Sequence, residues 1–349
     1  MSKTILVTGA NSFIGGWIIK YLLDKGYNIR GTVRSQAKKS RVLDGVPKEQ
    51  QCRISFVHIN DIMTDSFDEA VQGVDGIIHV ASPVRLTLTD PEQDFLLPAI
   101  NGTMKVLQAA HKYNQNHPNK IIRIVITSSF ASVIDTRKGL RPGYSYTDKD
   151  WCPCTYADAL AEKNDSLTVY RAAKTCAERA AWEFLDKEKP SFTIATICEP
   201  IVFGPRINDF NSLDDMNSSN SSIWSLITSD KNAKMPETKL IFEVDVRDVA
   251  YTHVAALEQC TDTSQRYLIA TGTWSYQSVA DIIHESFLIP ESIKNTTPIG
   301  TKGQQLPPHY TIDSSKAQKD LGVTYIPLIK TIEDLMLQFI KLKEKLAHE

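Results

Sequence analysis

Short apolar runs rich in β-branched residues alternate with longer amphipathic stretches along most of this chain. The apolar runs lie at residues 4–8, 28–33, 54–59, 76–81, 121–127, 192–198 and 267–270. Helical spacing of apolar residues predicts helices over 13–25, over 92–113 with a kink at Pro98, and over 172–185. This alternation predicts an α/β protein, a doubly wound parallel sheet of the Rossmann type with helices on both faces. Ligands of such sheets bind at the carboxyl ends of the strands.

Charge and composition exclude several classes of protein. The 349 residues carry 39 basic and 41 acidic side chains, and a net charge of −2 argues against nucleic-acid binding. No apolar run is long enough to cross a membrane, and the N-terminus leads into a strand rather than a signal peptide. The six cysteines are scattered, and the spacing of Cys152 and Cys154 fits no zinc site. We therefore expect a cytoplasmic protein without a metal and without a membrane or nucleic-acid partner.

A glycine-rich turn follows the first predicted strand and leads into the first predicted helix. Gly9, Ser12 and Gly15 give this turn the spacing Gly-x-x-Ser-x-x-Gly. Gly9 permits a tight turn, Gly15 lets helix and strand pack closely, and the backbone N–H groups of a helix N-terminus attract an anion. The spacing is neither the Gly-x-Gly-x-x-Gly fingerprint nor a P-loop, and such a turn can be purely structural. Its position directly after the first strand favours a pyrophosphate-binding loop of a dinucleotide site.

The end of the second predicted strand indicates which dinucleotide is bound. An NAD site usually places an acid about 20 residues further on, where it bonds the ribose 2′-hydroxyl. Here Arg34, Lys38 and Lys39 follow the strand, and no acid is nearby. Such cations suit a 2′-phosphate, so NADPH/NADP+ is the expected cofactor, with a solvated basic face as the alternative. Asp61 and Ile62 follow the third strand and lie either at the adenine or at a helix N-cap.

Tyr170 and Lys174 are four residues apart and therefore share a face if they lie on a helix. Tyr21 begins the same pattern but lies on the apolar stripe of the first helix, where a core position is expected. Reduction of a carbonyl by hydride leaves an alkoxide that must be protonated, and a tyrosine can supply that proton. A nearby cation favours the phenolate and eases proton relay, and a serine hydroxyl can hold the carbonyl oxygen. The serines that end the fifth predicted strand lie where active sites gather, although turn bonding would also explain them.

Taken together, the motifs resemble the extended short-chain dehydrogenases/reductases. The nearest resemblance is to the fungal NADPH-dependent methylglyoxal and carbonyl reductases, which are related to dihydroflavonol reductase. It spans almost the whole chain and is weakest over 206–240 and after residue 290. The motifs that carry it are, in order, Gly9-x-x-Ser12-x-x-Gly15, Arg34, Asp61-Ile62, His79-Val-Ala-Ser-Pro83, Thr127-Ser-Ser129, Tyr170-x-x-x-Lys174, Val202-Phe-Gly-Pro205 and Asp245-Val-Arg-Asp248.

The resemblance implies a role for each site residue. Ser129 would orient the carbonyl, Tyr170 would donate the proton, and Lys174 would bond the nicotinamide ribose and tune Tyr170. Arg34 and Lys38 would hold the 2′-phosphate. The implied cofactor-binding residues are Gly9, Asn11, Ser12, Phe13, Ile14, Gly15, Arg34, Lys38, Asp61, Ile62, Ala81, Tyr170, Lys174, Val202 and Ser219. The implied substrate-pocket residues, each of which core packing would also explain, are Val84, Phe130, Ile134 and Trp224.

Two residues depart from the family pattern. Ser12 replaces the middle glycine of the loop, where its side chain would either crowd the pyrophosphate or donate a hydrogen bond to it. Cys198 and Glu199 replace an Asn-Pro pair, so a carboxylate follows the sixth predicted strand. Glu199 either faces solvent or borders the substrate pocket, where it would disfavour anionic substrates and accept ammonium groups. His79 lies in a predicted strand and is expected to be a core histidine rather than a ligand.

The chain length suggests about two structural units. We expect a dinucleotide-binding core formed by residues 1–205 and 241–273, and a smaller substrate-binding cap formed by 206–240 and 274–349. The polar stretch 208–222 is either a disordered surface loop or a loop that orders over a ligand. The expected function is NADPH-dependent reduction of aldehydes and ketones to alcohols. The alternatives are a nucleotide-sugar epimerase or dehydratase on the same scaffold and a non-catalytic NADPH-sensing regulator, and monomer and homodimer both stay open.

Overall fold

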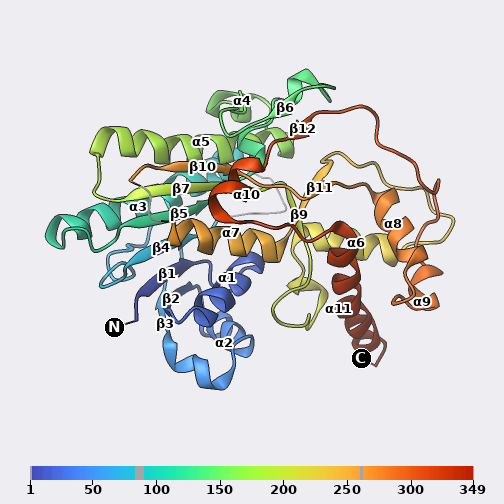
Figure 1. Ribbon diagram of the computed structural model, residues 1–349, viewed down its shortest axis with the longest axis horizontal. Coiled ribbons are helices and arrows are strands. Elements are labelled where there is room, and N and C mark those ends of the chain that lie inside the picture. Colours follow the sequence, from blue (N-terminus) through green and yellow to red (C-terminus); the bar gives the residue numbers. More distant parts are fainter. Residues whose placement is uncertain (1, 83–89, 260–261, 349) are drawn as a thin grey trace.

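The computed structural model describes residues 2–82, 90–259 and 262–348 (Figure 1). Its centre is a seven-stranded sheet in the order β10-β7-β5-β4-β1-β2-β3, and every neighbouring pair is parallel. The prediction of a doubly wound parallel sheet is therefore confirmed. The strands are β1 (Thr4–Thr8), β2 (Asn28–Val33), β3 (Ile54–His58), β4 (Gly76–His79), β5 (Arg123–Thr127), β7 (Thr193–Cys198) and β10 (Gln265–Leu268).

Helices cover both faces of this sheet because its strands are apolar on both sides. One face packs against α1 (Phe13–Asp24), α2 (Gln36–Asp44), α7 (Val246–Glu258) and α10 (Ser315–Leu321). The other face packs against α3 (Leu97–Asn116) and α5 (Ser166–Glu188). In Figure 1, α5 runs above β7 and α7 runs below it.

Two predicted helices differ from the observed ones. The expected single helix over 92–113 is a wider helical turn at Glu92–Leu96 that joins α3, and Pro98 lies in the first turn of α3. Helical structure runs on from residue 91 into α3, and Leu97 N–H still bonds to the carbonyl of Glu92, five residues back. The change from this wider turn to regular α-helix therefore falls beside Pro98, where the sequence predicts a kink. Helix α5 is longer than predicted because Asp165 caps it by accepting from the backbone N–H of Leu167 (3.0 Å).

Two small sheets flank the carboxyl end of the central sheet. One consists of β11 (Gly272–Thr273), β9 (Phe242–Asp245) and β8 (Ile201–Phe203), and the other pairs β12 (Thr311–Ile312) with β6 (Ser145–Tyr146). Between β6 and α5 lies the short α4 (Tyr156–Ala161). Segments far apart in sequence therefore meet beside the ends of β5 and β7.

A separate apolar cluster lies beside the sheet and includes Phe203, Ile223, Trp274 and Phe339. The helices that contribute to it stand to the right in Figure 1 and are α6 (Ser218–Ile227), α8 (Tyr276–Glu285), α9 (Glu291–Lys294) and α11 (Leu328–His348). Helix α10 is different, because Ala317 and Leu321 pack into the sheet layer. In the part of the chain that the structure describes, no helix combines the length and apolarity needed to span a membrane.

The polar stretch 208–222 is ordered, so the prediction of a disordered surface loop is wrong. Its second part begins α6 at Ser218. Ser219 Oγ donates to the carbonyl of Val202 (2.5 Å), and Asn220 Nδ2 donates to the carbonyl of Gly204 (2.9 Å). Two of the polar side chains thus bond to the backbone in and just after β8, whereas others, such as Asp209 and Asp214, are exposed to solvent.

Candidate active site

The glycine turn between β1 and α1 has the conformation that its sequence predicts. Gly9 has φ +67°, and a Cβ on it would lie 3.1 Å from the Cα of Ala81. A Cβ on Gly15 would lie 2.4 Å from the carbonyl oxygen of Gly9, which is closer than any side chain tolerates. Both glycines are therefore required, Gly9 for its left-handed backbone and Gly15 for the close approach of helix and turn.

Ser12 has a role that neither sequence interpretation included. It is the N-cap of α1, and its Oγ accepts from the backbone N–H of Gly15 (3.0 Å). Phe13 and Ile14 follow as the first two residues of the helix. The serine therefore stabilises the helix N-terminus and leaves its own proton available to an acceptor in front of the loop.

A cavity of about 290 Å³ lies in front of this turn. Its cations are Arg34 and Lys38, both exposed, and no Asp or Glu occurs among the described residues that line it. A helix N-terminus, a close-approach glycine and two cations fit a dinucleotide that carries a 2′-phosphate. The lining residues are Gly9, Asn11, Ser12, Thr32, Val33, Arg34, Lys38, Ile59, Ile62, Phe67, Val80, Ala81 and Ser82.

Two residues near the cavity are arranged differently. Asp61 is not part of the lining, and its Oδ1 accepts from the backbone N–H of Met63 (2.8 Å) at the start of a turn rather than of a helix. Lys39 points toward the ring of Phe56, with Nζ 5.6 Å from the ring centroid, so it is not a third cation of the lining.

His79 is the core histidine that the sequence predicts. It is buried at the end of β4, and its Nδ1 lies 2.8 Å from Oγ1 of Thr8. Burial, assisted by the charge of Lys174, lowers the pKa of His79 to about 4, so its ring is neutral. Thr8 Oγ1 also accepts from the backbone N–H of Ala81 (3.1 Å), which joins the glycine turn to the end of β4.

Tyr170 and Lys174 both lie on α5, one helical turn apart, as their spacing predicts. Lys174 is buried and lines a small cavity of about 20 Å³ with Ser128 at the end of β5 and Ser82 after β4. That volume is about the size needed for one water molecule. The face of α5 that carries the lysine therefore adjoins the ends of β4 and β5.

Ser129 follows β5 and is buried, with 8% of its surface exposed. Its Oγ accepts from the backbone N–H of Ala131 (3.2 Å) and caps a short 3-10 turn. Accepting this bond uses an oxygen lone pair and not the hydroxyl proton. The serine is therefore held in place and can still donate to a carbonyl oxygen.

An apolar cluster rich in aromatic rings, which we call the aromatic cluster, lies next to Ser129. Of the predicted pocket residues, Phe130 and Ile134 belong to it and are almost fully buried. Phe130 contacts rings that the sequence did not single out, with centroid distances of 5.5 Å to Tyr146, 6.0 Å to Tyr310 and 6.4 Å to Phe242. These three rings come from β6, β9 and a segment before β12, so no local pattern groups them.

Trp224, another predicted pocket residue, does not belong to the aromatic cluster. Trp224 packs against Phe339 of α11 (5.2 Å between ring centroids), in the cluster beside the sheet. Val84 lies outside the described residues. Val202 and Ser219, which were predicted to contact the nicotinamide half, bond to each other.

Glu199 is buried, with 7% of its surface exposed, so the interpretation that places it in solvent is wrong. It follows β7, and its carbonyl accepts from the backbone N–H of Phe130 (2.7 Å). Its Oε2 has no hydrogen-bond partner in the described part of the chain. Burial raises the pKa of Glu199 to about 8 even though the charge of Lys174 opposes this shift.

Two further residues at the ends of β5 and β7 escaped the sequence analysis. Glu178 lies on α5 four residues after Lys174, so helical spacing could have identified it. Arg266, on β10, forms an ion pair with Glu178 (2.7 Å between Nε and Oε1), and no local pattern points to it.

Comparisons with known proteins agree with this geometry. Residues 5–270 match the model of the NAD dependent epimerase/dehydratase family. The chain is 30% identical over 353 residues to the NADPH-dependent methylglyoxal reductase of Saccharomyces cerevisiae, and this alignment covers 98% of the present chain and 100% of the yeast protein. It is 32% identical over 354 residues to a ketoreductase of Aspergillus niger, with 98% of each chain covered.

The fold also matches solved structures. The yeast methylglyoxal/isovaleraldehyde reductase complexed with NADPH superposes with a TM-score of 0.89 at 30% sequence identity, covering 98% of this chain and 99% of that one. The match spans the sheet, its helices and the flanking region together. The chain therefore belongs to the NAD dependent epimerase/dehydratase family, the extended short-chain dehydrogenases/reductases.

Proposed function

We propose that this protein reduces aldehydes and ketones to alcohols with NADPH. The observation that carries the proposal is the meeting of three features at one edge of the sheet. These are a cation-lined cavity in front of the glycine turn, the face of α5 that carries Lys174, and the held hydroxyl of Ser129. The names of the yeast and Aspergillus relatives, a methylglyoxal reductase and a ketoreductase, support the same chemistry.

The residues present fit NADPH. Gly9, Asn11, Ser12, Phe13, Ile14 and Gly15 would hold the pyrophosphate, and Arg34 and Lys38 would hold the 2′-phosphate. Ile62 and Ala81 line the same cavity, and Asp61 adjoins Ile62. Val202 and Ser219 would lie toward the nicotinamide. When bound, NADPH supplies a hydride to the substrate carbon.

Side chains of the protein would orient and protonate the carbonyl oxygen of the substrate. Ser129 would donate a hydrogen bond to that oxygen and hold it in register, as its free O–H allows. Tyr170 would protonate the alkoxide that develops there. Lys174, one turn further along α5, would bond the nicotinamide ribose and favour the phenolate that remains on Tyr170.

We further propose that residues 206–240 and 274–349 form the substrate-binding cap over a core of 1–205 and 241–273. Phe130 and Ile134 offer an apolar surface for the substrate's substituents, and Glu199 would border the same space. Val84 and Trp224 stay assigned to the pocket by family resemblance alone. The free thiols of the described cysteines suit a reduced compartment, so we propose a cytoplasmic location.

Two alternatives use the same fold. A protein whose structure was solved in complex with UDP-glucose and NAD superposes with a TM-score of 0.69 at 19% identity, which is a likeness of fold only. Arg34 and Lys38 favour NADPH over NAD. Tyr170 and Lys174 on one helix face argue against a non-catalytic sensor.

One assay distinguishes the three functions. NADPH oxidation is followed with a panel of aldehydes, ketones and a nucleotide sugar, and NADH is tested in parallel. We expect turnover with carbonyl compounds and NADPH. Turnover of the nucleotide sugar alone would indicate the epimerase or dehydratase, and NADPH binding without any turnover would indicate the regulator.

A further inference from the structure

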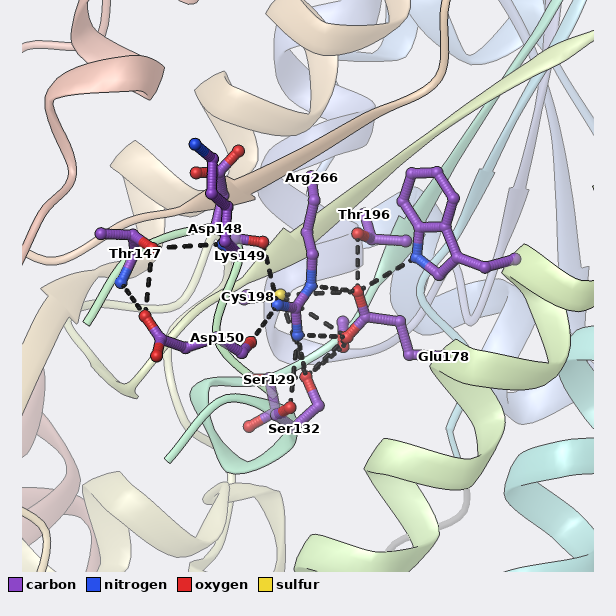
Figure 2. Close-up of polar contacts among 12 residues, drawn as sticks. Ser129, Ser132, Thr147, Asp148, Lys149, Asp150, Glu178, Thr196, Cys198 and Arg266 are labelled. Carbon is purple, nitrogen blue, oxygen red and sulfur yellow. Dashed lines mark hydrogen bonds and ion pairs between the residues drawn. The ribbon is translucent and has the colours of Figure 1, made fainter. Parts of the chain in front are cut away.

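Glu178 and Arg266 form a buried ion pair behind the candidate active site (Figure 2). Their side chains are only 1% and 6% exposed, and Arg266 Nε lies 2.7 Å from Glu178 Oε1. The pair joins α5 to β10 across the carboxyl end of β7. None of the roles assigned above to cofactor or substrate involves either residue.

The carboxylate of Glu178 is fully satisfied by hydrogen-bond donors. Its Oε2 accepts from the hydroxyls of Ser128 (2.6 Å) and Ser132 (2.5 Å). Its Oε1 accepts from Thr196 (2.8 Å) as well as from Arg266. Burial would raise the pKa of Glu178, but the charge of Arg266 and these bonds outweigh it and hold the pKa below its ordinary value. Glu178 is therefore a fixed anion.

The bonds of this anion enclose Ser129. Ser128 precedes Ser129, and the hydroxyl of Ser132 also lies 2.7 Å from the carbonyl oxygen of Ser129. Arg266 Nη2 donates to the carbonyl of Ser132 (3.3 Å). The segment 128–132 is thus held on both sides of Ser129 by a single ion pair.

The same ion pair fixes the helix that carries the proton donor. Tyr170, Lys174 and Glu178 are spaced by four residues and share one face of α5. Glu178 lies about 12 Å along the helix from Tyr170, at 1.5 Å per residue. Because it bonds to the segment that contains Ser129, it sets how α5 lies against the end of β5.

Arg266 extends these contacts toward the aromatic cluster. Its Nη1 donates to the carbonyl of Asp148 (3.1 Å) and to that of Asp150, and its guanidinium lies 3.8 Å from the ring centroid of Trp151. Figure 2 shows Arg266 between Glu178 and the segment 147–150. That segment follows Tyr146, which belongs to the aromatic cluster.

We propose that Glu178 and Arg266 are positioning residues for carbonyl reduction, which orient Ser129 relative to Tyr170 without touching substrate or cofactor. This inference rests on the proposed function. A buried ion pair is a poor source of stability compared with apolar side chains of the same volume, but its directional bonds fix geometry well. In an active site, a displacement of about 1 Å can reduce the rate about 100-fold.

The first test is Glu178→Gln, which keeps the shape but turns one acceptor into a donor against Arg266 or the serines. We expect kcat per NADPH-binding site to fall roughly 10- to 100-fold, with the Kd of NADPH within about twofold of wild type. The matched control is Asp245→Asn. Asp245 is equally buried, pairs with Arg247 (2.7 Å) and bonds Thr331, away from Ser129. Counting NADPH-binding sites removes the contribution of unfolded molecules.

The deciding measurement is a double-mutant cycle with Ser129→Ala. If Glu178 acts through Ser129, Glu178→Gln should lower kcat by less than about twofold in the Ser129→Ala background. Should Glu178→Gln bind no NADPH, Ser132→Ala replaces it, with an expected loss of about 3- to 10-fold that also disappears in the Ser129→Ala background.

If the losses in kcat from the two single variants multiply in the double variant, the positioning role is wrong. It is also wrong if Asp245→Asn lowers kcat per site as much as Glu178→Gln does. A wild-type protein that binds NADPH but reduces no carbonyl compound would refute the proposed function and this inference together. An active wild type with multiplying losses would refute only the inference.

Discussion

Two regions meet at the carboxyl edge of the sheet, and they are built in opposite ways. The first, the glycine-turn region, comprises residues 8–15 and 32–38, which are close in sequence, and its charges on Arg34 and Lys38 are exposed. The second, the aromatic region, comprises the aromatic cluster with Glu199 and Glu243, and it draws on segments from residue 130 to residue 312.

The two regions also differ in the exposure of their charged residues. In the aromatic region Glu243 is fully buried, and neither of its carboxylate oxygens has a hydrogen-bond partner within the described residues. Burial raises the pKa of Glu243 to about 9 and that of Glu199 to about 8. We therefore expect cofactor affinity in the glycine-turn region to depend on the charge of the ligand, and we expect stability and substrate preference in the aromatic region to depend on pH.

The largest expected effect is the fall in kcat caused by Tyr170→Phe, where the two regions meet. Tyr170→Phe keeps the ring but removes the proton, so kcat should fall about 10²- to 10⁴-fold, the usual contribution of a positioned acid. The Kd of NADPH should change little, because the glycine-turn region is untouched. Steady-state kinetics and a fluorescence titration of NADPH measure the two quantities. A variant with near-normal kcat would show that another group donates the proton.

Glu243→Gln tests whether the aromatic region contains a buried neutral acid. Because its folded pKa of about 9 exceeds the unfolded value of about 4.3, the folded state holds a proton that the unfolded state releases. Wild-type stability should therefore decrease relative to the variant as pH rises from about 5 to 9, by up to about 1.4 kcal/mol per pH unit. Urea unfolding at several pH values measures the difference.

The control for this experiment is Glu162→Gln, which removes an exposed acid. Its unfolding free energy should run parallel to that of the wild type across the same pH range. Parallel curves for Glu243→Gln as well would mean that Glu243 is not held protonated, and the contrast between the two regions would disappear.

Arg34→Ala tests the charge response of the glycine-turn region. Loss of a bond to a charged phosphate should weaken NADPH binding by about 1.5–3 kcal/mol, whereas the Kd of NADH should stay almost unchanged. Lys39→Ala is the matched control, because Lys39 lies over Phe56 rather than in the cavity. Calorimetric titration with both cofactors measures the effect. Equal losses of affinity for NADPH and NADH would show that Arg34 does not bind the 2′-phosphate.

The smallest expected effect concerns substrate charge at Glu199. Its pKa of about 8 keeps the carboxyl group neutral at low pH and ionises it above pH 8. The kcat/KM ratio of a quaternary-ammonium ketone to a neutral ketone of equal size should therefore rise roughly 2- to 5-fold between pH 7 and 9, as for a partly solvated ion pair. In Glu199→Gln this rise should vanish. A ratio that climbs equally in both proteins would place Glu199 away from the substrate.

The sequence predicted well those parts of the site that depend on local backbone geometry. The positive φ of Gly9 and the helix face of Tyr170 and Lys174 follow from residue type and spacing. Ser12 was recognised as unusual, but its capping bond to Gly15 depends on the exact start of α1. Glu178 follows the same four-residue spacing as Tyr170 and Lys174, yet its meaning depends on Arg266, which is 88 residues away.

Local sequence patterns were therefore enough to predict the parallel sheet, the glycine turn and the part of α5 that carries Lys174, because each depends on one turn or one period of regular structure. The extension of α5 back to Tyr170 was not predicted, because it depends on the cap at Asp165. Local patterns did not show which aromatic rings surround Phe130, where the polar stretch 208–222 forms α6, or that Glu199 and Glu243 are buried. These features depend on burial and pairing between segments that folding brings together from distant parts of the chain. A carboxylate's charge is set by that environment and not by its neighbours in sequence.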